Sequence, residues 1–444
     1  MSVIRRLTRK GHTAYLVGGC VRDLLLDRVP KDFDIATSAR PRQVKRIFRN
    51  CRVIGRRFRL AHVIFGDKII EVSTFRQAAD TEKPENQGDL LIRDDNVFGT
   101  PEEDARRRDF TINGLFYDIQ QGTVIDYVGG LHDLERRTLR MIGDPDIRFQ
   151  EDPIRILRAI KFSARLGVNI SPKTMEFIEA HRDKISRSAP PRILEEVIRM
   201  TRGLSSLASY DLMLRTRVLE VVLPDVAQAL KENSEHDDLY RRYLGVLDRE
   251  VSDGVDATVP IVFGTYLLPI VFPPSFFEDD KLDTRPDGMS TESRIEEVLA
   301  DLIPRLRLSR RDAGRLRQIL MAQRRLAPSS RKRRFSRSSV ARQAYFPEAL
   351  TLFAIHCSTI GKWTDECGRW KAALEAQRER DEEIRRQEAP RRRRRGGSGR
   401  SRGNESSGSG EGGGNGGQSG SGSGSGRSRR RRRRRKKPPS SSAS

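Results

Sequence analysis

Two aspartates separated by one residue, Asp32 and Asp34, lie in the segment Pro30-Lys-Asp-Phe-Asp-Ile-Ala36. On a β-strand, residues two apart project from the same face, so both carboxylates point one way while Phe33 and Ile35 point the other. Neighbouring carboxylates repel each other unless a cation lies between them or one of them is protonated. Carboxylate oxygens suit Mg²⁺, which takes its remaining ligands from water and substrate phosphates. The pattern favours two Mg²⁺ ions that activate an attacking 3′-hydroxyl and stabilise departing pyrophosphate, and the alternative is a surface pair on an edge strand.

A diglycine turn precedes this pair in the run Leu16-Val-Gly-Gly-Cys-Val-Arg-Asp23. A strand that turns through Gly18 and Gly19 into a helix lets backbone N–H groups approach a phosphate. Arg22 adds a cation to that phosphate site, and we expect Arg57 or Arg59 to contribute further charge. The alternative is an ordinary turn, because diglycine turns are common.

Two other segments carry charged residues at informative places. Glu71 lies in the apolar run Ile69 to Val72, on a strand expected to neighbour Asp34, and a two-metal site has use for a third carboxylate. Glu151-Asp-Pro-Ile-Arg155 is expected to open a helix, which places Asp152 and Arg155 on one face at i, i+3. The alternative for the second segment is a structural ion pair at a helix N-terminus.

Short apolar runs bounded by turn residues predict strands in the first third of the chain, with helices between them. The predicted strands are Ala14–Val17, Phe33–Ala36, His62–Phe65, Ile69–Val72 and Thr123–Tyr127. Helical periodicity predicts helices over Val21–Leu26 and Pro41–Phe48. We therefore expect a small mixed sheet with helices, an α/β head that spans residues 1–145.

Amphipathic helices replace the strands after about residue 145, so the predicted fold class is α+β. We expect a helical neck and body over residues 146–275 and a second helical, RNA-binding domain over 276–377, divided at the acidic loop Glu278–Glu292. From residue 378 the chain becomes charged and then rich in Gly, Ser and Arg, a composition that predicts a disordered tail over 378–444.

The charge balance points to a polyanionic partner. The formal net charge is +24 and the pI is about 10.5, and most of the excess lies beyond Arg391. The uncharged stretch Val259–Phe277 is interrupted by five glycine and proline residues, so we expect a broken, buried helix and no membrane span. The four cysteines form no CxxC pair and follow no secretory leader, which favours a reducing cytoplasm.

The motifs occur in the order typical of one family. Their combination and order resemble the class II nucleotidyltransferases, a superfamily that contains bacterial poly(A) polymerases and CCA-adding tRNA nucleotidyltransferases. The resemblance rests on Gly18-Gly19-x-x-Arg22-Asp23, Asp32-x-Asp34, Arg107-Arg-Asp-Phe-Thr-Ile-Asn113 and Glu151-Asp-Pro-Ile-Arg155.

The resemblance implies roles for individual residues. Asp32 and Asp34 would be metal ligands, and Asp109 would be the third catalytic carboxylate, with Glu71 as the second choice. Arg108 would contact ribose or phosphate. The ATP-binding set that it implies is Gly18, Gly19, Arg22, Asp23, Arg108, Asp152, Arg155 and Arg158.

The poly(A) polymerase branch fits better than the CCA-adding branch, because the segments 48–62 and 96–104, Leu308-Ser-Arg-Arg and the arginine-rich end look like its versions. Gly114 departs from the pattern, which has Ala or Ser there. Asp152 and Arg155 would read the adenine edge, but cytosine presents a similar edge, so they do not separate A addition from C, C and A addition. A loop over Gln77–Asp95 is a candidate for that choice.

The leading hypothesis is untemplated transfer of AMP from ATP to RNA 3′ ends, with two Mg²⁺ ions as cofactors. RNA 3′ ends and ATP are the expected partners, and the resemblance adds the RNA-decay machinery. The nearest rival is CCA addition to tRNA. A rival of another class is a non-catalytic RNA-binding protein whose affinity comes from the arginine tail.

Overall fold

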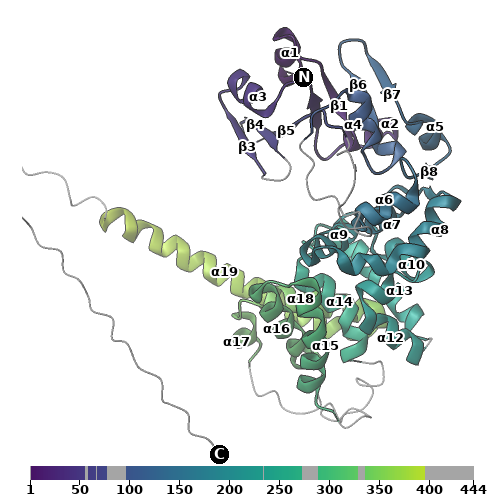
Figure 1. Ribbon diagram of the computed structural model, residues 1–444. Helices are drawn as coiled ribbons and strands as arrows, with labels where there is room; N and C mark the ends of the chain where they lie inside the picture. The colour runs from purple at the N-terminus through teal and green to yellow at the C-terminus, as the bar shows by residue number, and fades with distance from the viewer. Residues whose placement is uncertain are drawn as a thin grey trace, which may run out of the picture. The chain divides into compact units, whose positions relative to one another are not determined.

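The structure, a computed structural model, describes residues 2–55, 59–66, 68–77, 97–233, 235–272, 289–328 and 336–395 (Figure 1). The predicted loop Gln77–Asp95, apart from its first residue, the acidic loop Glu278–Glu292 up to residue 288, Arg57, and the tail beyond Arg395 lie outside the described residues.

A seven-stranded sheet in the order β3-β4-β5-β2-β1-β6-β7 forms the first third of the chain. Strands β2 and β5 are parallel, and the other pairs are antiparallel. The strands are β1 (Ala14–Val17), β2 (Asp34–Thr37), β3 (Cys51–Ile54), β4 (Leu60–Phe65), β5 (Lys68–Thr74), β6 (Leu115–Asp118) and β7 (Thr123–Asp126).

The two faces of the sheet have separate apolar cores. On one face, Ile35 and Val72 pack with residues of α1 and α3, including Val3 and Val44. On the other face, Ala36 packs with four residues from other elements, among them Ala105 of α4. The helices of this region are α1 (Ser2–Arg9), α2 (Gly19–Leu25), α3 (Pro41–Ile47), α4 (Pro101–Arg106) and α5 (Gly130–Glu135), with a 3₁₀ turn η1 (Thr111–Asn113).

Helices dominate after α5, apart from the short parallel pair β8 (Thr138–Leu139) and β9 (Asn169–Ile170). One large apolar core runs from α2 through to α19. The elements are α6 (Pro145–Glu151), α7 (Ile154–Leu166), α8 (Pro172–His181), η2 (Arg182–Arg187), α9 (Pro190–Arg202), α10 (Ser206–Arg215), α11 (Leu219–Val222), α12 (Pro224–Glu232), α13 (His236–Ser252), α14 (Val259–Val271), α15 (Thr291–Leu306), α16 (Arg310–Leu326), α17 (Arg337–Ala341), α18 (Phe346–Ile360) and α19 (Thr364–Arg395).

The mixed α/β head and the helical region confirm the predicted fold class. Residues Val259–Val271 of the uncharged stretch form helix α14, which is buried on nearly every side and has Pro269 inside it. In the part of the chain that the structure describes, no helix is long and apolar enough to cross a membrane. The sequence reading missed strands β3 and β6, which are four residues long.

The predicted start of a disordered tail at residue 378 is wrong, because α19 continues to Arg395. Ala, Glu, Gln and Arg in this stretch are good helix formers. Within it, Gln377 donates to Asp381 at 2.9 Å, which is an i, i+4 contact that supports a helix.

Candidate functional site

Strand pairing brings two of the predicted carboxylates together. The parallel register of β2 and β5 places Asp34 directly opposite Glu71. Register partners on neighbouring strands project to the same side of a sheet, so both side chains leave the face that also carries Ala36. The β2–β5 pair therefore brings together Asp34 and Glu71, which are far apart in sequence. These two residues, with the nearby Asp32, are called the acidic edge.

The acidic edge has an unfavourable local field for a carboxylate. Burial raises the pKa of Asp34, the Glu71 carboxylate raises it further, and Asp32 adds to the same effect. The Arg108 guanidinium acts in the opposite direction but does not cancel the rise. A nearby cation would relieve this repulsion, which is the electrostatic condition expected of a metal site.

Asp32 does not lie on the strand as predicted. Strand β2 begins at Asp34, and Asp32 and Phe33 precede it as extended, exposed chain. Phe33 is 45% exposed, so the apolar face predicted for it does not exist at this position. Pro30 and Lys31 keep the approach to the strand irregular. Asp32 nevertheless stays close enough to Asp34 to influence its pKa.

Glu71 is half-exposed and turns toward a histidine. Its Oε1 lies 3.3 Å from His62 Nε2, a residue of the neighbouring strand β4. Among the described residues, no three His, Cys, Asp or Glu side chains stand together as a complete metal cage. Asp32, Asp34 and Glu71 therefore do not come together as a three-residue metal cluster, and an ion held by two of them would take its other ligands from water and phosphate.

The diglycine turn requires glycine for two reasons. Gly18 has φ of +73°, a conformation that L side chains rarely adopt, and it stands at the N-terminus of α2. A Cβ at Gly18 would also lie 2.8 Å from Arg108 Nη1. The absence of a side chain here therefore lets the Arg108 guanidinium approach the turn.

Arg108 is held in place by a buried acid that sequence reasoning did not single out. Asp104 of α4 accepts from Arg108 Nη2 at 2.9 Å and from Arg107 Nε at 2.9 Å. Asp104 is completely buried, and the two guanidinium groups keep its pKa below the usual value despite the opposing effect of burial. The spacing of an acid three and four residues before two arginines on a helix was the available signal.

Asp109 occupies a different environment from the acidic edge. Its Oδ1 accepts from the Phe110 backbone N–H at 2.8 Å and from Asn113 Nδ2 at 3.1 Å. Its Oδ2 accepts from Arg158 Nε at 2.7 Å. Burial raises the pKa of Asp109, but the Arg158 charge and the hydrogen bonds from Asn113, Arg158 and Phe110 together lower it to about 2. Both oxygens are engaged inside the protein, so the structure does not present Asp109 to the acidic edge.

Arg22 and Asp23 are also inside the protein. Arg22 is 2% exposed, donates to Asp23 at 2.6 Å and reaches Asn113 Oδ1 at 2.5 Å. Asp23 lies 3.6 Å from Arg165 of α7. These contacts tie α2 to the Asp109 segment, so Arg22, predicted as a phosphate ligand, positions the turn instead of facing a phosphate.

Arg158 joins the head segment to helix α9. Besides Asp109 it lies 3.8 Å from Glu196, which also pairs with the buried Lys161. Burial first, and then the Arg158 charge, lower the pKa of Lys161 to about 8. Arg158 and Lys161 both lie over the Phe162 ring. The contacts of Arg158 are structural, whereas the prediction placed it on ATP.

Asp152 and Arg155 do not share one helix face, contrary to prediction. Asp152 has φ of −150° and separates α6 from α7, because the following residue is Pro153 and a residue before proline avoids the helical conformation. Arg192 of α9 holds both oxygens of Asp152, at 2.9 and 2.8 Å. No sequence pattern pointed to Arg192.

Arg155 is buried beside the same break. Its Nη1 donates to the Arg148 carbonyl at 2.7 Å and to Glu151 at 3.0 Å. Arg148 in turn donates to the carbonyls of Arg107 and Arg108, at 2.6 and 2.9 Å. Helix α6 is thus hydrogen-bonded to the segment that carries Arg108.

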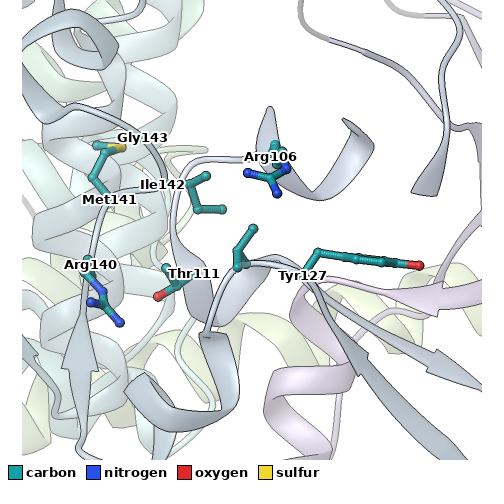
Figure 2. Close-up of a pocket in the computed structure, with 8 residues that line it drawn as sticks. Arg106, Thr111, Tyr127, Arg140, Met141, Ile142 and Gly143 are labelled. Carbon is teal, nitrogen blue, oxygen red and sulfur yellow. The ribbon is translucent and has the colours of Figure 1, made fainter. Parts of the chain in front are cut away.

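A cavity of about 370 Å³ lies next to the Arg107–Asn113 segment (Figure 2). Its walls include Arg106, Thr111, Arg140 and Ile142, and none of the predicted site residues lines it. Thr111 and Arg140 both bind Asp133, at 2.5 and 2.6 Å. Because Thr111 and Arg140 are already paired with Asp133, these side chains of the lining hold the structure together behind the segment.

Comparison with known proteins finds two family matches along the chain. The family described as Poly A polymerase head domain matches residues 14–140, and the family described as Probable RNA and SrmB-binding site of polymerase A matches residues 167–230. Poly(A) polymerase I of Salmonella typhi is 45% identical over 241 residues, 53% of this chain and 52% of that protein. Poly(A) polymerase I of Haemophilus influenzae is 40% identical over 274 residues, 60% of each chain. The chain therefore spans little more than half the length of the curated relatives it matches.

CCA-adding enzymes are more distant relatives. The enzyme of Bacillus subtilis is 36% identical over 220 residues, 50% of this chain and 54% of that protein. Among solved structures, the Bacillus stearothermophilus CCA-adding enzyme in complex with CTP aligns with a TM-score of 0.57 and 24% identity, over 85% of this chain and 80% of that one. A tRNA nucleotidyltransferase complexed with a primer tRNA and an incoming ATP analog aligns with a TM-score of 0.54 and 20% identity, over 85% and 99%. These likenesses establish the shared fold.

Proposed function

We propose that this chain, whose residues 14–140 and 167–230 match two families of poly(A) polymerase segments, is a poly(A) polymerase of the nucleotidyltransferase superfamily. It transfers AMP from ATP to the 3′-hydroxyl of RNA without a template and releases pyrophosphate. The higher identity to poly(A) polymerases than to CCA-adding enzymes supports this branch.

One observation carries the proposal, namely the acidic edge. Asp34 faces Glu71 in register and lies near Asp32, and burial together with repulsion from these carboxylates raises the pKa of Asp34. Asp32 and Asp34 would hold Mg²⁺, with Glu71 as the adjacent third carboxylate. When bound, two such ions activate the attacking hydroxyl and neutralise charge on the departing pyrophosphate. Waters and the triphosphate complete the ligand set that the protein leaves open.

Arg108 is the residue best placed to contact the triphosphate. Asp104 fixes its guanidinium, and the missing side chain of Gly18 leaves space for that group beside the turn. Its charge also reaches Asp34. A fixed guanidinium stabilises charge on phosphate oxygens at little cost in reorganisation.

Asp152 and Arg155 are the proposed base-reading pair. A carboxylate accepts from adenine N6 and a guanidinium donates to N1, and G and U present the reverse pattern. Arg192 orients Asp152, and Glu151 orients Arg155. Discrimination between A and C must then come from outside this pair.

RNA 3′ ends and ATP are the proposed substrates, and the cytoplasm with its RNA-decay machinery is the proposed setting. The match of residues 167–230 to a probable RNA-binding segment supports RNA as the partner. The basic composition of the chain supports the same partner.

The test is to incubate the protein with Mg²⁺ and each nucleoside triphosphate in turn, with an unstructured RNA oligomer or a tRNA lacking its terminal CCA, and to sequence the products. Long A-only extension of both RNAs is the expected result. Addition of C, C and A to tRNA alone would identify the second candidate, which the CCA-adding relatives favour. No extension would identify a binding protein, and an RNA function unaltered by Asp32→Ala with Asp34→Ala would support that reading.

A further inference from the structure

A groove of about 360 Å³ runs between α13 and the C-terminal end of α18, two helices that pack on each other. Its lining residues are Arg242, Gly245, Val246, Arg249, Ser358 and Thr359. They lie outside residues 14–140 and 167–230, so neither matched family covers this surface.

The groove carries two exposed arginines along one helix face. Arg242 and Arg249 are seven residues apart on α13, which is two helical turns or about 10 Å along the axis. In the described part of the chain, the Arg249 side chain has no hydrogen bond or ion pair. Arg242 pairs with Asp238 at 3.0 Å, and both side chains are more than half exposed. Such exposed pairs contribute little, so another anion can replace Asp238.

Between the two arginines, the groove is lined by small side chains, and one wall carries a polar group. Gly245 and Val246 give the α13 side a low profile, and Ser358 offers an exposed hydroxyl from α18. Under this floor, Tyr243 of α13 hydrogen-bonds to His356 of α18, and their rings are stacked with centroids 6.0 Å apart. This contact fixes the two walls of the groove relative to each other.

We propose that this groove binds the phosphodiester backbone of the RNA strand upstream of its growing 3′ end, an inference that rests on the proposed function. The two guanidinium groups, about 10 Å apart along the helix axis, and the Ser358 hydroxyl can each bind a phosphate of a single strand. The lining offers no aromatic ring or carboxamide for a base edge. The groove therefore holds RNA without reading its sequence.

A cross-linking experiment on the full chain tests the position of the RNA. All four native cysteines are buried, so Ser358→Cys introduces the accessible thiol for a photoreactive label. We expect the label to cross-link to upstream nucleotides of an RNA primer, and an equivalent label at Ser293→Cys on α15 to cross-link much less. Equal yields at the two positions, or none at Ser358→Cys, would overturn the proposal.

The second arm removes the charges. We expect Arg242→Gln with Arg249→Gln to weaken binding of a long primer about tenfold and to reduce the slope of log K against log salt by about 1.4. The matched control is Arg5→Gln with Arg9→Gln on α1, exposed arginines of the head, which should change neither quantity. Extension of primers too short to reach the groove should be unaffected.

Binding is measured without ATP, so this arm is independent of catalysis. If the wild type extends RNA and the groove variant binds long primers as the control does, the groove proposal is wrong and the proposed function stands. If the wild type binds RNA through the groove but never extends it, the groove proposal stands and the proposed function is wrong. Loss of the Ser358→Cys cross-link on addition of free pyrophosphate at equimolar amounts would show that the groove holds a small anion and would overturn the RNA assignment.

Discussion

Asp34 and Asp109 are aspartates of the same head, and burial raises the pKa of both, but their neighbours act in opposite directions. Around Asp34 the neighbours include two further carboxylates, and its pKa rises. Around Asp109 they are Arg158, an amide and a backbone N–H, and its pKa falls to about 2. A carboxylate with its charge already balanced holds structure together, whereas one with unbalanced charge is available to a cation. On the proposed function, this difference separates a carboxylate that would bind metal from one that holds the structure together.

The largest expected effect comes from Asp34→Asn. It should lower kcat for nucleotide addition by at least about 1,000-fold, roughly 4 kcal/mol of barrier, because a metal ligand is lost. The raised pKa means that ionised Asp34 costs stability at neutral pH, so the free energy of unfolding should stay equal or rise. Primer-extension kinetics and thermal melting check both. Asp27→Asn, an exposed aspartate of the same head, is the control and should change neither.

Asp109→Asn should act mainly on stability. It leaves Arg158 without its buried partner, so the free energy of unfolding should fall by about 3 kcal/mol. Urea denaturation measures this, with Glu102→Gln in an exposed helix pair as the control. An unchanged unfolding free energy together with a complete loss of catalysis would instead make Asp109 a catalytic carboxylate.

The dependence of the free energy of unfolding on acid pH tests the same contrast between Asp34 and Asp109. The folded pKa of Asp109 lies near 2 and the ordinary value is 3.8, so its contribution is fully present above pH 4 and is lost as pH falls toward 2. The shift corresponds to about 2 kcal/mol. Denaturation of wild type and Asp109→Asn across this range should show a shallower acid slope in the variant. Parallel slopes would mean that the pKa of Asp109 is the same in the folded and the unfolded protein.

Glu71→Gln gives the smallest expected effect. Its side chain is half-exposed and contacts His62, so its loss should leave the melting temperature unchanged. As the neighbour of Asp34 it should still lower kcat about tenfold, roughly 1.4 kcal/mol, by weakening metal binding. A rate equal to that of wild type would remove Glu71 from the candidate site.

The strands that carry chemistry could be predicted because local pattern decides them. Apolar runs with turn residues located β1, β2, β4, β5 and β7 within a few residues. The pairing of Asp34 with Glu71 follows from a parallel register that no local pattern contains. Strands β3 and β6 could not be predicted, because they are short and their apolar residues show no distinct period.

Prediction was weaker where partners are distant in sequence. The charge of Arg22 suggests a phosphate ligand, and only the fold shows that its guanidinium donates a hydrogen bond to Asn113 instead. The helix predicted through Asp152 ignored Pro153, a signal that was present in the sequence. No local pattern predicted the role of Arg192, because its contact with Asp152 joins residues 40 positions apart in the sequence.

The most direct test of the separation is a Mn²⁺ titration followed by electron paramagnetic resonance, with Mn²⁺ in place of Mg²⁺ and a non-hydrolysable ATP analogue present. We expect wild type and Asp109→Asn to bind the metal equally, with Asp109→Asn measured at a temperature where it is folded, and Asp34→Asn to bind it at least about tenfold more weakly. Loss of metal from Asp109→Asn, or its retention in Asp34→Asn, would contradict the assignment of the acidic edge as the metal site.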